Sequence, residues 1–113
     1  WEPAGPDWLP HRVQDRVTGI AAAELQCDDP EAVARRWSEI AELPIIAAPS
    51  GPSIALDNAR LRFVPCRDGR PEGLGGIDIR TSDRDAILRA AKAEGRVSGP
   101  NQIYLCGMRI NLT

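Results

Sequence analysis

The chain of 113 residues contains the same pattern of sequence twice. The segment 24–33, ELQCDDPEAV, matches the segment 78–87, DIRTSDRDAI, in its acidic, apolar and Asp-x-acidic-Ala-apolar positions, 54 residues further along. The segment 53–63 matches the segment 102–112 at an offset of 49 residues, and both have the pattern of a β-hairpin. Because both matches occur in the same order, the sequence predicts two similar modules, although two copies are too few for a solenoid.

The first module begins with a strand and a helix. Apolar residues predict a strand over 16–27, in which alternation places Glu24 and Gln26 on the face opposite to Leu25. Two aspartates before Pro30 are typical of a helix start, and Leu43-Pro44 ends this helix. After a short edge segment we expect a hairpin whose turn lies at Asp57-Asn58, since asparagine tolerates the left-handed conformation.

The second module repeats these elements in the same order. We expect a strand over 75–81, a helix capped by Ser82 or Asp83 that ends at Ala93, and a loop over 95–100. A hairpin over 103–112 then closes the chain, with its turn at Cys106-Gly107.

The length and the proline pattern predict one domain preceded by an arm. A chain of this size buries a single core. We expect an N-terminal arm at 1–16 and one domain at 17–113, made of module one (17–66), a connector (67–73) and module two (74–113). The arm holds Trp1 and Trp8, and we expect both to pack on the domain or on a partner chain. A start at Trp1 indicates a fragment of a longer protein.

The totals of charge and hydropathy exclude several classes of protein. The net charge is −2 with 27% charged residues, which argues against a nucleic-acid-binding or membrane-surface protein. No apolar run approaches the length of a membrane span, so we expect a cytoplasmic protein. The three cysteines are widely spaced and lack metal-binding motifs, which favours buried, reduced thiols.

Taken together, these features resemble the vicinal oxygen chelate superfamily, also called the glyoxalase, bleomycin-resistance and extradiol dioxygenase fold. The resemblance covers residues 17–113 and rests on the Asp-Pro-Glu-Ala helix start, Arg36-Trp37 on the helix, and the Gly73-Leu74-Gly75-Gly76-Ile77 opening of the second module. It implies an α+β fold. Two tandem βαβββ-type modules would form a curved, cup-like mixed sheet with one helix per module on its outer face.

The chain departs from this family at the metal-binding positions. The resemblance implies a divalent metal held by the first and last strands of each module, yet the positions of the opening ligands hold Ala22 and Gly76. Arg62 and Asn111 stand where the closing strands usually carry glutamate. A guanidinium group repels cations, so we expect no metal or other cofactor. Glu24 and Asp78, as two displaced oxygen ligands, are the alternative that keeps a divalent metal open.

Alternation along the strands predicts a polar cup. Four arginines against two carboxylates give this face a formal charge of +2, which favours a small organic acid or carbonyl compound as ligand. Arg62 and Arg80 are the first choice for a carboxylate-binding pair. In the alternative, the two acids pair with two of the arginines and the others reach solvent or a subunit interface. The residues expected in the cup are Glu24, Gln26, Arg60, Arg62, Asp78, Arg80, Arg109 and Asn111.

Three functions fit these patterns. The first is a glyoxalase-related lyase or dioxygenase-like enzyme, in which Glu24 or Asp78 is the catalytic base and Gln26, Asn111 and the arginines hold the substrate. The second is a metal-free binding module of the bleomycin-resistance kind. The third is a degenerate domain that supports or dimerises with another one. A homodimer or an intrachain domain partner is expected, because an open cup and an apolar arm need cover.

Overall fold

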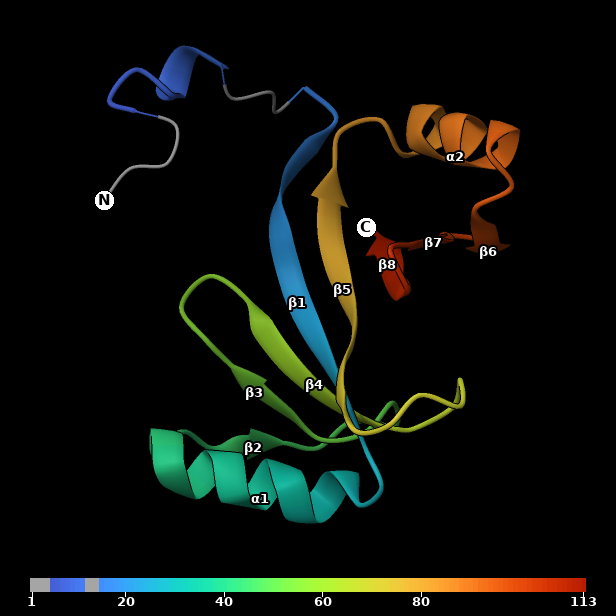
Figure 1. The fold of residues 1–113 in the computed structure, drawn as a ribbon. Coiled ribbons are helices and arrows are strands. Elements are labelled where there is room, and N and C mark those ends of the chain that lie inside the picture. Colours follow the sequence, from blue (N-terminus) through green and yellow to red (C-terminus); the bar gives the residue numbers. More distant parts are fainter. Residues whose placement is uncertain (1–4, 12–14) are drawn as a thin grey trace.

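The computed structural model describes residues 5–11 and 15–113 and contains one mixed eight-stranded sheet with two α-helices (Figure 1). This confirms the predicted α+β fold. In chain order the elements are η1 (Leu9–His11), β1 (Val17–Cys27), α1 (Pro30–Ala41), β2 (Ile45–Ile46), β3 (Ser53–Ala55), β4 (Arg60–Pro65), β5 (Gly73–Thr81), α2 (Arg84–Ala93), β6 (Val97–Gly99), β7 (Gln102–Leu105) and β8 (Met108–Leu112).

The strand order is symmetric about the middle of the sheet. It runs β2-β3-β4-β1-β5-β8-β7-β6. Counted outward from the centre, each half has the order first, fourth, third and second strand of its own module. The two first strands, β1 and β5, pair antiparallel at the centre, and each pairs in parallel with the last strand of its own half. Glu24 lies beside Arg62 in one half as Asp78 lies beside Asn111 in the other, as the sequence repeat requires.

One helix covers each half of the sheet, and each packs against the apolar side chains of that half. The side chain of Asp29 caps α1 by accepting a hydrogen bond from the Ala32 amide at 3.2 Å, and Asp83 caps α2 in the same way. Ala34 of α1 packs in a buried cluster with the strand residues Cys27, Ile54 and Phe63. Ala91 of α2 packs in the counterpart with Ile79, Ile103 and Leu112. Since the helices take up the apolar face, the polar strand positions are left on the opposite face.

The loops differ from expectation at two places. The segment 95–100 was expected to be a loop, but Val97–Gly99 forms the edge strand β6 against β7, which satisfies part of its backbone. Asn58 does not adopt the left-handed conformation, because four residues connect β3 to β4 and the Leu56 amide bonds to the Ala59 carbonyl. The turn at Cys106-Gly107 is as predicted, with φ of 52° and 76°.

The cysteines are all unpaired, but they are not all buried. Cys27 is buried under α1, where burial raises the pKa of its thiol. Cys66 is half-buried, and Cys106 is exposed at the β7–β8 turn. The expectation of buried thiols is therefore wrong for Cys106, because the turn that suits a positive φ lies at the surface.

Part of the predicted arm lies outside the described residues, including Trp1. Within the described part, Trp8 precedes η1 and its side chain is 41% exposed. Neither α1 nor α2, nor any other helix in residues 5–11 and 15–113, is long and apolar enough to span a bilayer.

Candidate functional site

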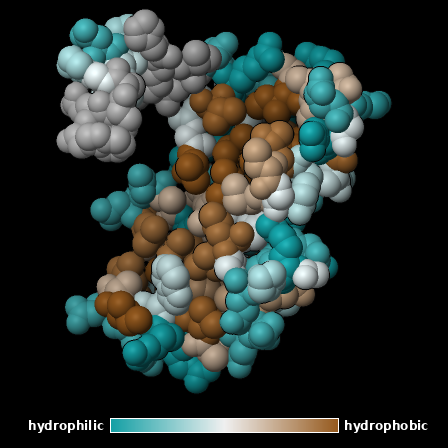
Figure 2. All heavy atoms as spheres, in the orientation of Figure 1, coloured by the Kyte–Doolittle hydropathy of each residue, from teal (hydrophilic) through white to brown (hydrophobic). Residues whose placement is uncertain are grey.

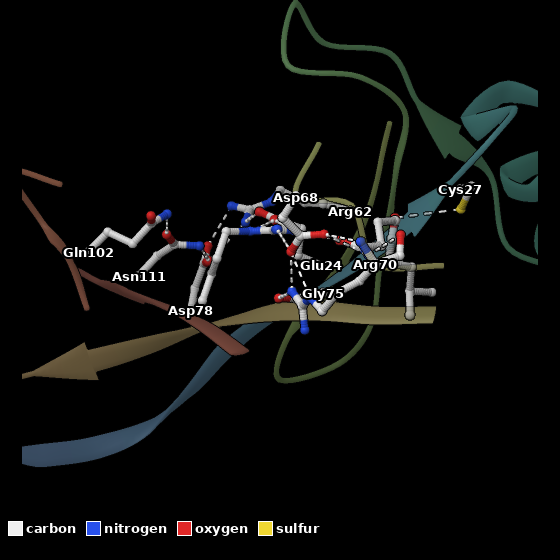
Figure 3. Close-up of polar contacts among 12 residues, drawn as sticks. Glu24, Cys27, Arg62, Asp68, Arg70, Gly75, Asp78, Gln102 and Asn111 are labelled. Carbon is white, nitrogen blue, oxygen red and sulfur yellow. Dashed lines mark hydrogen bonds and ion pairs between the residues drawn. The ribbon is translucent and has the colours of Figure 1, made fainter. Parts of the chain in front are cut away.

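A network of charged and amide side chains crosses the sheet on the face opposite the helices (Figure 3). On β1, Leu25 and Cys27 pack toward α1, so the alternating residues Glu24 and Gln26 lie on the other face. The same alternation on the neighbouring strands brings six of the eight predicted residues into this network: Glu24, Gln26, Arg62, Asp78, Arg109 and Asn111.

Arg62 on β4 links the carboxylates of both modules. Its Nη1 and Nη2 donate to the two carboxylate oxygens of Asp78 at 2.6 and 2.9 Å. Its Nη2 also donates to Glu24 Oε2 at 2.6 Å. The planar guanidinium group is therefore bidentate to one acid and shared with the other, a geometry that a point charge does not offer.

Arg109 on β8 binds the other oxygen of Glu24. Its Nε and Nη2 donate to Glu24 Oε1 at 3.0 and 2.6 Å, and Nη2 also donates to Gln26 Oε1 at 3.1 Å. Its Nη1 donates to Asp68 Oδ2 at 2.7 Å. The side chains of Glu24 and Arg109 are each 14% exposed, so these contacts are only weakly screened by solvent.

The connector supplies two members that the sequence analysis missed, Asp68 and Arg70. Arg70 Nε donates to Asp68 Oδ2 at 2.6 Å, and Arg70 Nη2 donates to the Gly75 carbonyl at 2.8 Å. The hydrogen bonds from Arg70 hold the pKa of the Asp68 carboxyl well below its usual range. The available signal was a pair of opposite charges on either side of Gly69, which has a φ of 77° and allows the tight turn between them.

Amide side chains complete the network at its other end. Asn111 Nδ2 donates to Asp78 Oδ1 at 2.8 Å, and Asn111 Oδ1 accepts from Gln102 Nε2 at 2.8 Å. Gln102 on β7 was also missed. The second bond fixes the orientation of the Asn111 amide, so that it faces Asp78 as a donor.

The network carries no net formal charge, in contrast to the +2 expected for the cup. Three carboxylates, those of Glu24, Asp68 and Asp78, face three guanidinium groups, those of Arg62, Arg70 and Arg109. The alternative in which the acids pair with arginines thus describes the centre of the sheet. Arg60 and Arg80 lie apart from this network.

Arg60 and Arg80 line a hollow of about 400 Å³ between the β3–β4 loop and the two central strands. Arg80 Nη1 and Nη2 donate to the carbonyls of Ile20 and Asn58 at 3.1 and 2.9 Å, which holds its guanidinium group at the hollow. These two bonds use two of the five N–H donors of the side chain. The lining residues are Ala21, Ala22, Ala55, Leu56, Ala59, Arg60, Arg62, Asp78 and Arg80.

The described residues do not fit the divalent metal that the family resemblance implies. A Cβ atom at Gly76 would lie 2.9 Å from the Arg109 carbonyl oxygen, so a ligand side chain has no room there. Ala22 is buried and offers no ligand atom. Among residues 5–11 and 15–113, no three His, Cys, Asp or Glu side chains come together as a group able to hold a metal. No chemical step through a metal follows from this site.

Neither protein-family models nor curated proteins match the sequence. Solved structures do match the fold. The methylmalonyl-CoA epimerase of Mycobacterium tuberculosis superposes with a TM-score of 0.66 at 16% identity, covering 89% of this chain and 90% of that one. A variant of the Streptomyces coelicolor methylmalonyl-CoA epimerase, in complex with 2-nitronate-propionyl-CoA, gives a TM-score of 0.56 at 16% identity, covering 85% and 96%. A hypothetical protein from Staphylococcus aureus gives 0.56 at 10% identity, where this chain covers only 32% of that protein.

These likenesses define the class of fold. The chain has the vicinal oxygen chelate, or glyoxalase-like, fold that was predicted from the repeat and the motifs. Within that class its structure is similar to methylmalonyl-CoA epimerase over nearly the whole length of both chains. At 16% identity the similarity concerns the fold, and the site must be interpreted from its own residues.

Proposed function

We propose that this domain binds a small carboxylate compound in the hollow beside β4, with Arg60 and Arg80 as the anion-binding residues. The observation that supports this most directly is the charge of the hollow. Arg60 and Arg80 line it and take part in no ion pair among the described residues, whereas Arg62 and the one acid of the hollow, Asp78, are already bound to each other at 2.6 and 2.9 Å. Guanidinium groups match carboxylates in a bidentate manner, so an anion with this geometry is favoured.

The rest of the lining indicates the body of the ligand. Four alanines and Leu56 form the remaining wall, and the hollow of about 400 Å³ is of the size that small-molecule sites have. A short aliphatic body would contact these side chains while its carboxylate meets the arginines. The ligand class is therefore a short-chain organic acid.

The geometry supports binding better than the proton transfer considered as an alternative. Glu24 accepts hydrogen bonds from two arginines, and Asp78 accepts from Arg62 and Asn111. A catalytic base needs a lone pair directed at the substrate proton. Each carboxylate already accepts three hydrogen bonds from protein donors, which favours a role in holding the sheet and positioning Arg62 over a role as the base.

The similar structures suggest which acids to test first. One neighbour was solved with 2-nitronate-propionyl-CoA, and a nitronate is a planar anion like a carboxylate. Methylmalonate, malonate and propionate therefore cover one or two carboxylates on a short aliphatic body. Malonamide has a similar size without the charge.

The test is isothermal titration calorimetry of the purified chain with these four compounds. We expect saturable 1:1 binding of at least one acid and none of malonamide. Arg80→Ala and Arg60→Ala should each weaken the binding about tenfold or more, since a charge-assisted hydrogen bond contributes about 1.5–3 kcal/mol.

A matched control separates this site from general charge effects. Arg36→Ala removes an arginine whose side chain is 72% exposed on α1 and should leave the affinity unchanged. Arg80 also bonds to two backbone carbonyls, so Arg60→Ala, for which the structure gives no such bonds, is the cleaner variant. The proposal is refuted if none of the three acids binds, or if Arg60→Ala and Arg80→Ala both bind as tightly as the unsubstituted protein.

A second function, as a supporting or dimerising domain, is favoured by the exposed surface. Trp37 contacts Phe63 edge-on at 5.9 Å, yet it is 42% exposed, and Ile40 on the same helix is 71% exposed. Figure 2 shows hydrophobic side chains gathered in a band along one face of the molecule.

Large apolar side chains exposed together need cover, which a second copy of the chain would supply. We therefore expect sedimentation equilibrium to give the mass of a dimer at micromolar concentration. Ile40→Glu should shift the equilibrium toward the monomer. A monomer at all concentrations up to 100 μM would exclude self-association as the role of this face.

A further inference from the structure

The guanidinium group of Arg62 lies between the two central carboxylates, one from each module. Its nitrogens reach Glu24 Oε2 at 2.6 Å and both oxygens of Asp78 at 2.6 and 2.9 Å. Arg62 also occupies one of the closing-strand positions that the family resemblance assigns to a metal ligand. A position expected to bind a cation thus carries a cation itself.

We infer that Arg62 is a built-in replacement for the divalent metal of this fold, and that its side chain covers a latent cation site formed by Glu24 and Asp78. The fixed cation bridges two carboxylates at diagonal positions of the antiparallel β1–β5 pair, in which Asp78 pairs with Ala22 and Glu24 with Gly76, and Arg109 supplies the second positive charge. Without it, two acids that are 14% and 10% exposed would keep, among the described residues, Arg109 and the Asn111 amide as their side-chain partners.

Two further contacts and one steric restriction support a permanent rather than exchangeable cation. Arg109 binds the second oxygen of Glu24, and Asn111 is oriented as a donor to Asp78. Gly76 has no space for a ligand side chain because the β8 backbone lies 2.9 Å from its Cβ position. Glu24 and Asp78 are therefore held by protein donors, with the guanidinium group of Arg62 between them. A metal would instead need side chains with oxygen or nitrogen lone pairs in the places of these donors.

The inference predicts that removing Arg62 creates metal binding. Arg62→Glu places a third carboxylate beside Glu24 and Asp78, and hard divalent cations such as Mn²⁺ prefer oxygen ligands. We expect this variant to bind Mn²⁺ at 1:1, at least about tenfold more tightly than the unsubstituted protein, by calorimetry and by loss of the free-Mn²⁺ electron paramagnetic resonance signal. Mn²⁺ should also raise its thermal midpoint, and EDTA should reverse the rise.

Arg36→Glu is the matched control, since it makes the same change of charge on the exposed face of α1. The inference is overturned if the folded Arg62→Glu variant binds Mn²⁺ no better than Arg36→Glu. It is equally overturned if the unsubstituted protein binds Mn²⁺ stoichiometrically and loses thermal stability in EDTA, because Arg62 would then not be the resident cation.

A second variant keeps the test decisive if Arg62→Glu does not fold even with Mn²⁺. Arg62→Ala leaves a gap with the shape of a guanidinium group between the two acids. Guanidinium chloride at 5–20 mM should raise the thermal midpoint of Arg62→Ala, whereas NaCl at the same ionic strength should not. Absence of this rescue refutes the inference. The Arg60→Ala variant tests the carboxylate proposal separately, because it leaves the contacts of Arg62 with Glu24 and Asp78 intact.

Discussion

Glu24→Ala probes the central network most directly, because this one carboxylate accepts hydrogen bonds from two arginines of different strands. It accepts from Arg62 Nη2 at 2.6 Å and from Arg109 Nε and Nη2 at 3.0 and 2.6 Å. The substitution removes all three bonds and leaves two guanidinium groups with fewer partners. Since Arg62 keeps Asp78 and Arg109 keeps Asp68, neither becomes an isolated buried charge.

The expected magnitude follows from these partners. Removing one member of a buried ion pair costs about 3–5 kcal/mol, and the remaining partners place this case near the lower end, at about 3 kcal/mol. A domain of this length has a free energy of unfolding of about 6–17 kcal/mol, so the variant should still fold. The corresponding fall in the thermal midpoint is about 12–24 °C.

The assay is urea denaturation followed by tryptophan fluorescence, with Glu39→Ala as the control. Glu39 also pairs with an arginine, but at 3.4 Å and with side chains 72% and 61% exposed, so its loss should cost less than about 0.5 kcal/mol. Arg109→Leu and the double variant complete a thermodynamic cycle, whose coupling energy should be about 1.5–3 kcal/mol. If Glu24→Ala costs no more than Glu39→Ala, the central network does not stabilise the fold and the reasoning fails.

Two further predictions concern the connector and the central strand. Arg70 lowers the pKa of Asp68 in the folded chain below the usual 3.8. The ionised carboxylate therefore adds stability that is complete above about pH 5 and declines as the pH falls toward the folded pKa. Asp68→Asn should make the thermal midpoint depend less steeply on pH between pH 5 and pH 2, and an unchanged slope would contradict this. Gly76→Ala places a Cβ atom 2.9 Å from the β8 backbone and should lower the free energy of unfolding by about 1–3 kcal/mol. Gly99→Ala is the control in the same denaturation series, because its Cβ atom would have its nearest contact at 3.4 Å and should be tolerated.

The local signals in the sequence were sufficient for most of the elements and for the main residues of each sheet face. An aspartate before a helix caps it wherever the helix packs, and period-two alternation assigns Glu24 and Arg62 to the face that Leu25 and Phe63 do not share. The repeat then predicted the symmetric sheet, because equivalent segments bury equivalent apolar faces. The edge strand β6 escaped prediction, since its pairing with β7 depends on a partner rather than on its own three residues.

Tertiary structure alone decided which charges meet. Alternation placed four arginines and two acids on one face, but it carries no information about Asp68. This residue lies in an irregular connector, 41 positions before Arg109, and reaches that arginine only through the folded chain. Whether an arginine binds a ligand or a neighbouring acid depends on distances of about 1 Å that strand register and loop path set. Sequence therefore determined the fold and the polar face, whereas the folded chain separated a neutral centre around Arg62 from a cationic hollow at Arg60 and Arg80.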